Sequence, residues 1–443
     1  MGIGGSGMSA AASLAINFGF DVDGCDENTS SPYLEKLKKK VVIQSGHSSD
    51  HLIGKDMLVV TPAVYFDNPK PEEFLAAKEV MTWQKFIGKY LHQKKEVICV
   101  AGTHGKSTTT ALLSLVFEKA GNDPSVMIGA TVNEWETNYR YGKSNYFIVE
   151  SDEFYDNFLN YFPSAIILNN IEFDHPDYFK SSEQLHNSFE KHLRSLKGKR
   201  ILVVNKDSEN AFKLAKKIRG VNLITYSTED NTADVYGEIV KRTKSQTEFR
   251  VTSEKLNVNE TFELKILGDH NVSNALGVIA MSLLYSIELI TTKSVLSNFN
   301  GIGRRLELVG EKDGVKIYDD YAHHPTAVKV TLQALRQKYP KNRIVAVVEP
   351  HSYSRTKALL SDYKGVFEEA DEVIIAPIFK ARDSDTFGIS EQSIVDASHH
   401  KNISAIESFD KIVDKLETEL IKNDVVIVMG AGKSYEISKK LLA

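Results

Sequence analysis

Cysteine is almost missing from this sequence, which has two among its 443 residues, Cys25 and Cys99. Each lies in a short apolar run of the kind that forms a buried strand, so a disulfide framework is excluded as the basis of the fold. Two buried thiols suit a reducing compartment, and the sequence therefore predicts a cytoplasmic protein.

Long apolar runs and a dominant charge are missing as well. No run approaches the roughly 20 residues that a membrane-spanning helix needs, and no cationic segment precedes an apolar one at the start of the chain. The net charge is -5, from 54 basic and 59 acidic side chains, and no basic stripe is present. We therefore expect no membrane partner and no nucleic-acid partner.

What the chain does have is length and an ordinary composition, with 42% hydrophobic and 26% charged residues. A chain of 443 residues exceeds what one hydrophobic core supports, which predicts two or three domains. We expect a monomer or a weak homodimer.

The chain is organised around the stretch Glu96 to Thr110, EVICVAGTHGKSTTT. An apolar run, a glycine turn and a helix-forming segment follow one another, which predicts strand, loop and helix. In such a loop the N–H groups point inward, Lys106 adds a positive charge, and Ser107 offers a hydroxyl to a metal ion. Val100 stands where the first glycine of the Walker pattern would fall, so we interpret this segment as a shortened phosphate loop. A plain glycine-rich turn is the alternative.

A second glycine motif opens the chain, where residues 2–7 read GIGGSG and Asp26 ends the next apolar run. This spacing fits a dinucleotide fingerprint, so an NAD-dependent oxidoreductase is one hypothesis, although it leaves the phosphate loop unexplained. Only Met1 precedes Gly2, and we expect the chain to begin inside its first strand.

Two predicted strands of the middle region end in groups that suit a metal. Glu150 ends one strand, and His175 follows the exit of another. Because the carboxyl ends of strands face the ligand in open α/β sheets, both should point toward the phosphate loop. Ser107 and Glu150 make a plausible magnesium site, and His175 could serve a second ion or could be a core histidine.

Domain boundaries follow from the short charged segment before the phosphate loop and from the Gly/Asn-rich segment near residue 300. The sequence predicts an α/β protein of three domains, 1–94, 95–300 and 301–443, with Rossmann-like outer domains and a mostly parallel central sheet. In the middle domain, alternation over 234–267 predicts a β-meander, and Asn271 and Asn274 stand in the first turn of the next helix, as caps or as ligands.

The last domain holds polar strand exits and a second glycine loop. The exits, DDYAHHPT and EPHSYSRT, indicate a binding face. The loop at 425–434, VVIVMGAGKS, has Ile427 where the Walker glycine should be, so we interpret it as a turn without nucleotide.

Eight motifs, in this order along the chain, resemble those of the Mur ligases: GIGGSGMS, AGTHGKSTTT, VESDE, NNIEFDH, LGDHNVSN, GRRLEL, DDYAHHPT and PHSYSRT. The resemblance spans essentially the whole chain and is nearest to the family branch that adds L-alanine. It implies an ATP-dependent ligase of peptidoglycan precursor synthesis, with ATP and Mg²⁺ as cofactors and UDP-N-acetylmuramate and L-alanine as substrates. It also implies an acyl phosphate intermediate and a mobile third domain.

The resemblance implies roles for individual residues. The UDP-sugar would lie on the first glycine loop, which comprises Gly2, Gly4, Gly5, Ser6, Gly7, Met8 and Ser9, with Asp26. ATP would contact Gly102, Thr103, His104, Gly105, Lys106, Ser107, Thr108, Asn271, Asn274, Arg305 and Asp320. Magnesium would bind Ser107 and Glu150, with a second ion at His175. The acyl phosphate and the incoming amine would face Tyr321, His323 and Arg355, so the catalytic set is Lys106, Glu150, His175, Arg305, Asp320, His323 and Arg355.

Two departures from the family pattern bear on the acceptor. Glu349 and Ser352 replace a glutamine and an arginine that the L-alanine branch typically has, so we expect Arg355 alone to be available to the acceptor carboxylate. EFDH and GRRLEL are similar to the murein tripeptide ligases, which attach L-alanyl-γ-D-glutamyl-meso-diaminopimelate and remain the alternative. A nucleotide or UDP-sugar sensor without catalysis is a further hypothesis.

Overall fold

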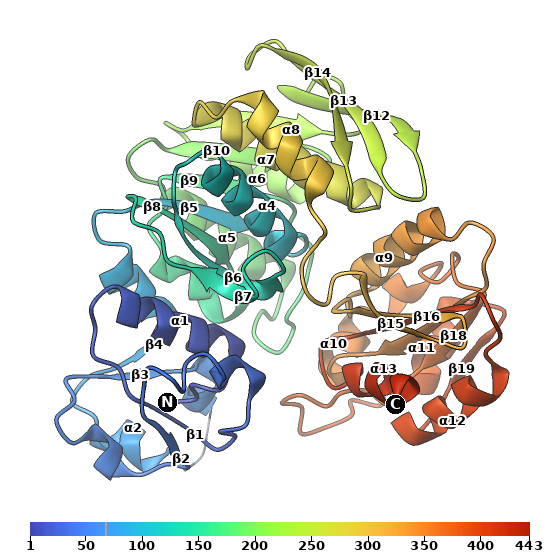
Figure 1. Ribbon diagram of the computed structural model, residues 1–443, viewed down its shortest axis with the longest axis horizontal. Helices are drawn as coiled ribbons and strands as arrows, with labels where there is room; N and C mark the ends of the chain where they lie inside the picture. The colour runs from blue at the N-terminus through green and yellow to red at the C-terminus, as the bar shows by residue number, and fades with distance from the viewer. Residues whose placement is uncertain (67–68) are drawn as a thin grey trace.

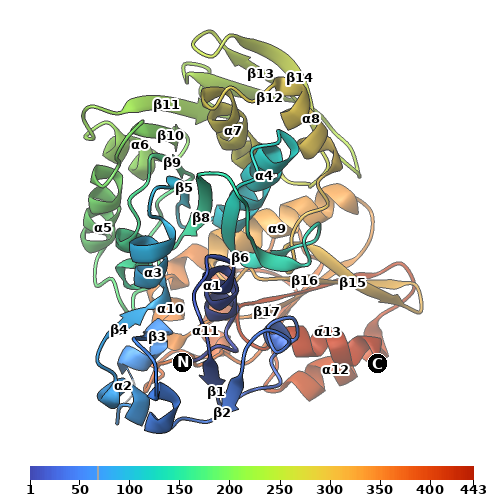
Figure 2. The same cartoon turned by 60° about the vertical axis from the view of Figure 1, so that its left-hand side comes forward.

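The computed structural model describes residues 1–66 and 69–443 and has three lobes (Figure 1). A central lobe lies between an N-terminal and a C-terminal lobe, which approach each other without merging (Figures 1 and 2). The three-domain α/β architecture expected from the sequence is confirmed. The boundaries at 94/95 and 300/301 remain predictions.

The helices and strands alternate along most of the chain, as in parallel α/β proteins. The helices are α1 (Ser6–Asn17), α2 (Glu72–Ala76), α3 (Trp83–Phe86), α4 (Lys106–Lys119), α5 (Ser182–Arg194), α6 (Glu209–Ala215), α7 (Asp269–Leu284), α8 (Leu289–Asn298), α9 (Pro325–Lys338), α10 (Tyr353–Ala358), α11 (Glu391–Ser398), α12 (Phe409–Glu419) and α13 (Tyr435–Leu442). The strands are β1 (Gly24–Asp26), β2 (Ile43–Ser45), β3 (Leu58–Val60), β4 (Val80–Thr82), β5 (Glu96–Ala101), β6 (Ser125–Val132), β7 (Thr137–Arg140), β8 (Tyr146–Ser151), β9 (Ala165–Leu168), β10 (Ile201–Asn205), β11 (Asn222–Ser227), β12 (Val235–Arg242), β13 (Thr247–Ser253), β14 (Val258–Leu264), β15 (Glu307–Lys312), β16 (Val315–Asp320), β17 (Ile344–Glu349), β18 (Glu372–Ile375), β19 (Ile403–Ala405) and β20 (Val425–Gly430).

The central lobe is built on a ten-stranded sheet in the order β14-β13-β12-β11-β10-β9-β5-β8-β6-β7. In this spatial order, the strands from β12 across to β6 are parallel to one another. At the edges, β7 pairs antiparallel with β6, and β13 pairs antiparallel with both β12 and β14. The predicted meander is therefore present as β12 to β14. β5 pairs with both β8 and β9, so the exits of these three strands meet at one edge of the sheet.

Apolar side chains cover both faces of this sheet. One core lies under α4, α7 and α8, and the other lies under α5 and α6. The second core also takes in Ala10, Ala11 and Leu14 of α1, so the N-terminal lobe shares its core with the central lobe. Figure 2 shows α1 lying against β6.

The strands of the N-terminal lobe are shorter than the sequence suggests. They form two parallel pairs, β1-β2 and β3-β4, of three residues each. The amine of Met1 donates to the carbonyl of Val59 in β3 and the amide of Gly2 to that of Cys25 in β1, so the first residues link the two pairs. Helix α2 ends at Ala76, and Val80 lies in β4, where it pairs with Leu58.

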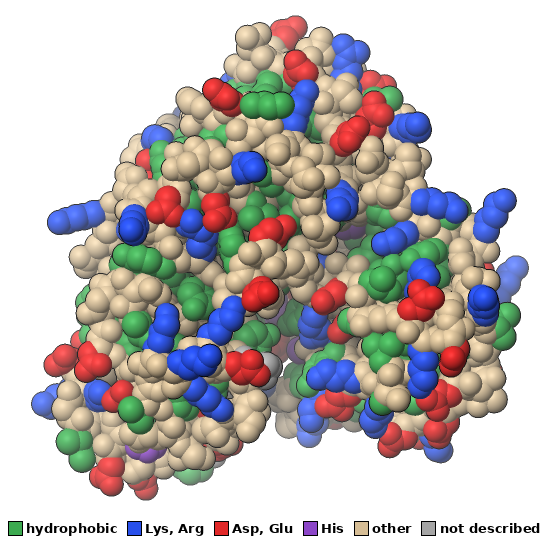
Figure 3. All heavy atoms as spheres, viewed as in Figure 1, with side chains coloured by type: hydrophobic (Ala, Val, Ile, Leu, Met, Phe, Trp, Pro, Cys, Tyr) green, Lys and Arg blue, Asp and Glu red, His purple; other side chains and the backbone are tan. Residues whose placement is uncertain are grey.

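The C-terminal lobe carries a six-stranded sheet in the order β15-β16-β20-β17-β18-β19, with a hairpin around Asp313 and Gly314. Only β15 is antiparallel to its neighbour. Figure 3 shows a notch between this lobe and the N-terminal lobe, with basic and acidic side chains intermixed around it. Among the described residues, no helix combines the length and the apolar character needed to cross a membrane.

Candidate active site

The predicted phosphate loop connects β5 to α4 at the carboxyl edge of the central sheet. Gly105 precedes the helix in a left-handed conformation (φ 79°), and a Cβ there would lie 2.4 Å from Oδ1 of Asn274, so only glycine fits. No side chain caps α4, which leaves the first amides of the helix directed at the space beyond the loop. The N-terminus of a helix in this state is an anion-binding site.

Lys106 lies at the mouth of this loop, where its ammonium contacts the chain's own groups. Its Nζ donates to the carbonyl of Gly102 at 2.6 Å and to Oε2 of Glu153 at 2.7 Å. Burial acts to lower the pKa of Lys106, but the carboxylates of Glu153 and Asp152 outweigh it and raise that pKa. The ammonium is therefore charged. Its anionic partner is the carboxylate of Glu153, which takes the place that a bound phosphate could occupy.

Ser107 and Glu150 meet as the sequence predicts. The hydroxyl of Ser107 donates to Oε1 of Glu150 at 2.9 Å, and Oε2 of the same carboxylate accepts the amide of Gly129 at 2.7 Å. A hydroxyl and a carboxylate side by side next to the phosphate loop are oxygen donors of the kind that a hard divalent cation takes.

His175 has different neighbours. It has a left-handed backbone (φ 55°), and its Nε2 lies 3.9 Å from Oε1 of Glu153. Asp152, Glu153 and His175 together offer ligand atoms within 4.8 Å of one another. Burial lowers the pKa of His175 to about 3, so its ring is neutral and can donate a lone pair.

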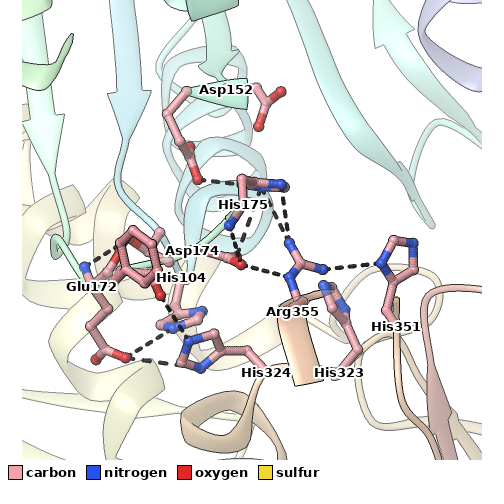
Figure 4. A network of polar contacts seen from close by, with 12 residues as sticks. His104, Asp152, Glu172, Asp174, His175, His323, His324, His351 and Arg355 are labelled. Carbon is pink, nitrogen blue, oxygen red and sulfur yellow. Dashed lines mark hydrogen bonds and ion pairs between the residues drawn. The ribbon is translucent and has the colours of Figure 1, made fainter. Parts of the chain in front are cut away.

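Arg355 of α10 is the centre of a polar network between the central and C-terminal lobes (Figure 4). Its Nε lies 2.7 Å from Oδ1 of Asp174, its Nη2 3.1 Å from Nδ1 of His175, and its Nη1 3.3 Å from Nδ1 of His351. Burial acts to raise the pKa of Asp174, but Arg355 holds it well below the ordinary value. Both side chains are almost buried, and Asp174 occupies the Nε edge of the guanidinium, so only its Nη edges are left for an acceptor carboxylate and that role stays a prediction.

A second cross-lobe contact joins His104 of the phosphate loop, Glu172 and His324 (Figure 4). Nε2 of His104 lies 3.2 Å from Oε2 of Glu172, which also accepts the hydroxyl of Thr326 at 2.8 Å. Burial acts to raise the pKa of Glu172, but the hydrogen bond from His104 lowers it, to about 2. The ring centres of His104 and His324 are 4.6 Å apart, so the C-terminal lobe contacts the phosphate loop itself.

Asn271 and Asn274 do not cap α7, whose N-cap residue is Gly268 and whose N-terminus has no side-chain cap hydrogen bond. Instead, Nδ2 of Asn274 donates to Oδ1 of Asn271 at 3.1 Å, and Oδ1 of Asn274 faces Gly105. The pair therefore lies against the phosphate loop, which favours the ligand alternative over the cap.

The remaining C-terminal residues gather beside this contact. The carboxylate of Asp320 accepts the amides of Leu306 and Ala322. Burial raises the pKa of Asp320, and the nearby charge of Arg305 limits the rise. The guanidinium of Arg305 lies 5.1 Å from the ring centre of Tyr321.

His323 has a defined tautomer. Its Nδ1 lies 2.8 Å from the carbonyl oxygen of Tyr321, so Nδ1 carries the proton and Nε2 the lone pair. Burial and the nearby Arg355 lower the pKa of His323 well below the ordinary value, so the ring is neutral.

The first glycine loop lies far along the chain from these groups, at the N-terminus of α1. Asp26 supports it, because Oδ2 accepts the amide of Gly4 at 2.7 Å. A cavity of about 320 Å³ opens beside the loop and α1. Its walls come from both lobes and include Ser9, Ser13, Tyr33, Lys36, Thr131 and Asn138. Ser6, at the start of α1, accepts two hydrogen bonds from Asn138.

The second glycine loop is filled by the chain itself. The carboxylate of Glu349 accepts the amides of Gly432, Lys433 and Ser434 at 3.0 to 3.1 Å. These are the N–H groups that would cradle a phosphate. The geometry agrees with the interpretation that this loop holds no nucleotide.

The sequence prediction missed several groups that the structure brings to the site. They are Asp152, Glu153, Glu172, Asp174, His324 and His351. All of them stand in polar strand exits that the sequence showed, but nothing in the sequence says which carboxylate faces which cation.

Comparison with known proteins gives three family matches in chain order. Residues 1–94 match the Mur ligase family catalytic domain, 100–282 the Mur ligase middle domain, and 304–432 the Mur ligase glutamate ligase domain. The UDP-N-acetylmuramate-L-alanine ligase of Caldanaerobacter subterraneus subsp. tengcongensis is 35% identical, over 100% of this chain and 96% of the relative. The namesake enzyme of Agathobacter rectalis is 36% identical over the same shares.

Solved structures agree on the fold. The Thermotoga maritima UDP-N-acetylmuramate-alanine ligase superposes with a TM-score of 0.80 at 24% identity, over 100% of this chain and 97% of the other. A murein peptide ligase from Psychrobacter arcticus gives 0.71 at 27% identity over the same shares. The chain therefore belongs to the Mur ligase family.

Proposed function

We propose that this protein is the ATP-dependent ligase that joins L-alanine to the lactyl carboxylate of UDP-N-acetylmuramate in peptidoglycan precursor synthesis. The observation that carries the proposal is that the C-terminal lobe contacts the central lobe at two places, with His324 beside His104 of the phosphate loop and Arg355 beside His175. These contacts would bring groups for phosphate and for an amino acid to one junction. The full-length relatives with that activity support it.

The phosphate loop would hold the β- and γ-phosphates of ATP, with Lys106 released from Glu153 to meet them. Ser107 and Glu150 would hold one Mg²⁺, and Asp152, Glu153 and His175 a second. The metal supplies charge neutralisation for phosphoryl transfer. Lys106 and Arg305 add positive charge from the two lobes, which stabilises the anionic transition state as the substrate carboxylate attacks the γ-phosphate.

The UDP-sugar would enter through the cavity between α1 and the central lobe. Its walls supply hydroxyls, an amide and the ammonium of Lys36, which suit a sugar nucleotide. Asn138 already joins the two lobes there, so the substrate would lie along an existing contact.

Amide formation needs an amine without its extra proton. Nε2 of His323 has its lone pair free of the Tyr321 carbonyl and would take that proton from the incoming ammonium. Arg355 would hold the acceptor carboxylate through the edge that now faces His351, while Nε keeps Asp174. The deprotonated amine attacks the acyl carbon, and phosphate leaves.

The test presents L-alanine, glycine, L-serine and L-alanyl-γ-D-glutamyl-diaminopimelate separately with ATP and UDP-N-acetylmuramate, and measures phosphate release. We expect turnover with L-alanine and weak discrimination against its neighbours, because a methyl pocket separates them by about 1 to 3 kcal/mol. Turnover confined to the tripeptide would replace the acceptor but keep the ligase, whereas no dependence on the UDP-sugar would remove the proposal.

A further inference from the structure

The N-terminal lobe contains a cluster of metal-ligating side chains that is separate from the ATP site. Cys25 comes from β1, His47 from the loop after β2, His51 from the 3-10 turn Ser49–Leu52, and Glu73 from α2. Cys25, His47 and Glu73 each offer a ligand atom within 4.8 Å of the other two. The catalytic scheme above uses none of them.

The four groups converge on one atom. Oε1 of Glu73 lies 3.4 Å from Sγ of Cys25, 3.3 Å from Nδ1 of His47 and 3.0 Å from Nδ1 of His51. Glu73 is fully buried, and its Oε2 has no hydrogen-bond partner among the described residues. Three possible donors contact Oε1, while Oε2 has none, although buried polar atoms normally each have a hydrogen-bond partner.

The same geometry suits a tetrahedral metal. Zn²⁺ binds sulfur at about 2.3 Å and nitrogen or oxygen at about 2.0 to 2.2 Å, so its ligand atoms lie about 3.3 to 3.6 Å apart. The distances from Oε1 of Glu73 to Cys25 and His47 fall in this range. The distance to His51 is shorter, at 3.0 Å, and that between Sγ of Cys25 and Nδ1 of His47 is longer, at 3.9 Å. Thiol and imidazole donors exclude Mg²⁺ and favour Zn²⁺.

We propose that Cys25, His47 and Glu73 bind a structural Zn²⁺ ion in the N-terminal lobe, with His51, whose Nδ1 lies 3.0 Å from the same carboxylate oxygen, as the fourth ligand. On binding, the sulfur, two imidazole nitrogens and one carboxylate oxygen donate electron pairs to the ion. The Cys25 thiol loses its proton to the buffer, no electron is transferred, and each Nδ1 gives up its hydrogen to the Nε2 tautomer. The site ties β1, the loop after β2 and α2 together, and it fixes Cys25 beside Asp26, which holds the glycine loop.

Co²⁺ is the probe, because a thiolate ligand gives a charge-transfer band that oxygen and nitrogen ligands do not. The full-length protein, stripped with a chelator, is titrated with Co²⁺ and then with Zn²⁺. We expect one equivalent of Co²⁺ to produce the thiolate band with the visible absorption of a tetrahedral ion, and one equivalent of Zn²⁺ to abolish both. The clusters near the phosphate loop contain no cysteine, so they cannot produce this band.

Matched variants assign the ligands. Cys25→Ser should remove the band, whereas Cys99→Ala should keep it, because Cys99 is buried in β5 of the central sheet. His51→Gln should keep the fold and weaken Zn²⁺ binding by more than the roughly 10- to 100-fold typical of outer-shell groups, whereas His186→Gln, at a half-buried histidine of α5, should not. Absence of the thiolate band in the unmodified protein, or its persistence in Cys25→Ser, would overturn the proposal.

Discussion

At the scale of single residues, Lys106 is the side chain on which ATP use depends most directly. Lys106→Ala should abolish ATP turnover, because it removes the buried cation at the phosphate loop and leaves the carboxylate of Glu153 without its partner. UDP-sugar binding should stay nearly intact, since the cavity for it lies beside α1. Isothermal titration with each ligand and a phosphate-release assay measure the two effects.

The matched control is Lys433→Ala, which alters the lysine of the glycine loop at 425–434. Its loop amides are taken by Glu349, so ATP affinity should hardly change. A large loss of ATP affinity in this variant would contradict the choice of loop, and equal loss of both ligands in Lys106→Ala would contradict their separate sites.

Glu153 gives a proton signal for ATP binding. Burial raises its pKa, and Lys106 limits the rise, to about 7. When ATP draws the lysine charge to its phosphates, the pKa of Glu153 should rise further, so the protein takes up a proton near pH 7. Calorimetric enthalpies of ATP binding in metal-free buffers of different ionisation enthalpy detect the uptake.

Glu153→Gln removes the titrating group and should abolish the buffer dependence. A dependence that is unchanged in this variant would assign the proton to another group. The sequence showed Glu153 only as part of a polar strand exit. Its pairing with Lys106 depends on the exits of β5 and β8 lying side by side, which local pattern does not reveal.

At the scale of elements, helix α10 depends on its first residue. The hydroxyl of Ser352 accepts the amide of Arg355 as an N-cap, and Ser352 has a left-handed backbone (φ 63°). Ser352→Ala should cost about 0.5 to 2 kcal/mol, and Ser352→Gly less, because glycine tolerates this backbone. Hydrogen exchange of the α10 amides, which does not require two-state unfolding, measures the difference.

An equal or larger loss in Ser352→Gly would show that the backbone conformation contributes little. Ser354 lies two residues further along the chain, and its hydroxyl donates to Asp383. Hydrogen exchange in Ser354→Ala therefore provides a comparison in which the cap hydrogen bond of Ser352 is kept.

The elements of the central lobe could be predicted from periodicity, and those of the N-terminal lobe less well. Val80 lies four residues after α2 but forms a strand, because pairing with Leu58 outweighs the local preference. The phosphate loop could be predicted because Gly105 and Lys106 have a fixed local geometry. The partner of Arg355 could not be predicted, since Asp174 lies 181 positions earlier in the chain and on another lobe.

At the scale of the whole molecule, the Asp174–Arg355 pair helps hold the C-terminal lobe against the central lobe. Since Arg355 depresses the pKa of Asp174, the contribution is present above the ordinary range of an aspartate, about pH 4, and is lost as pH falls through the lower value in the folded protein. Asp174→Asn should mimic that loss at neutral pH, increase the radius of gyration in solution scattering, and lower kcat/KM for the acceptor.

The control is Asp371→Asn, which breaks an ion pair with Arg336 inside the C-terminal lobe and should leave both quantities unchanged. If scattering were identical for Asp174→Asn and the unmodified protein, the remaining contacts, such as that of His324 with the carbonyl of Phe173, would be sufficient to keep the lobes together.

The Glu349 carboxylate in the loop after β20 acts as a resident anion. A glycine turn whose amides converge has a local positive potential, and the chain neutralises it with a charge of its own at the end of β17. The turn keeps its shape without a bound ligand, and a nucleotide arriving there would have to displace a tethered competitor whose effective concentration is very high. ATP should accordingly saturate the protein at one nucleotide per chain, although the glycine loop at 425–434 ends in the same GKS sequence as the phosphate loop.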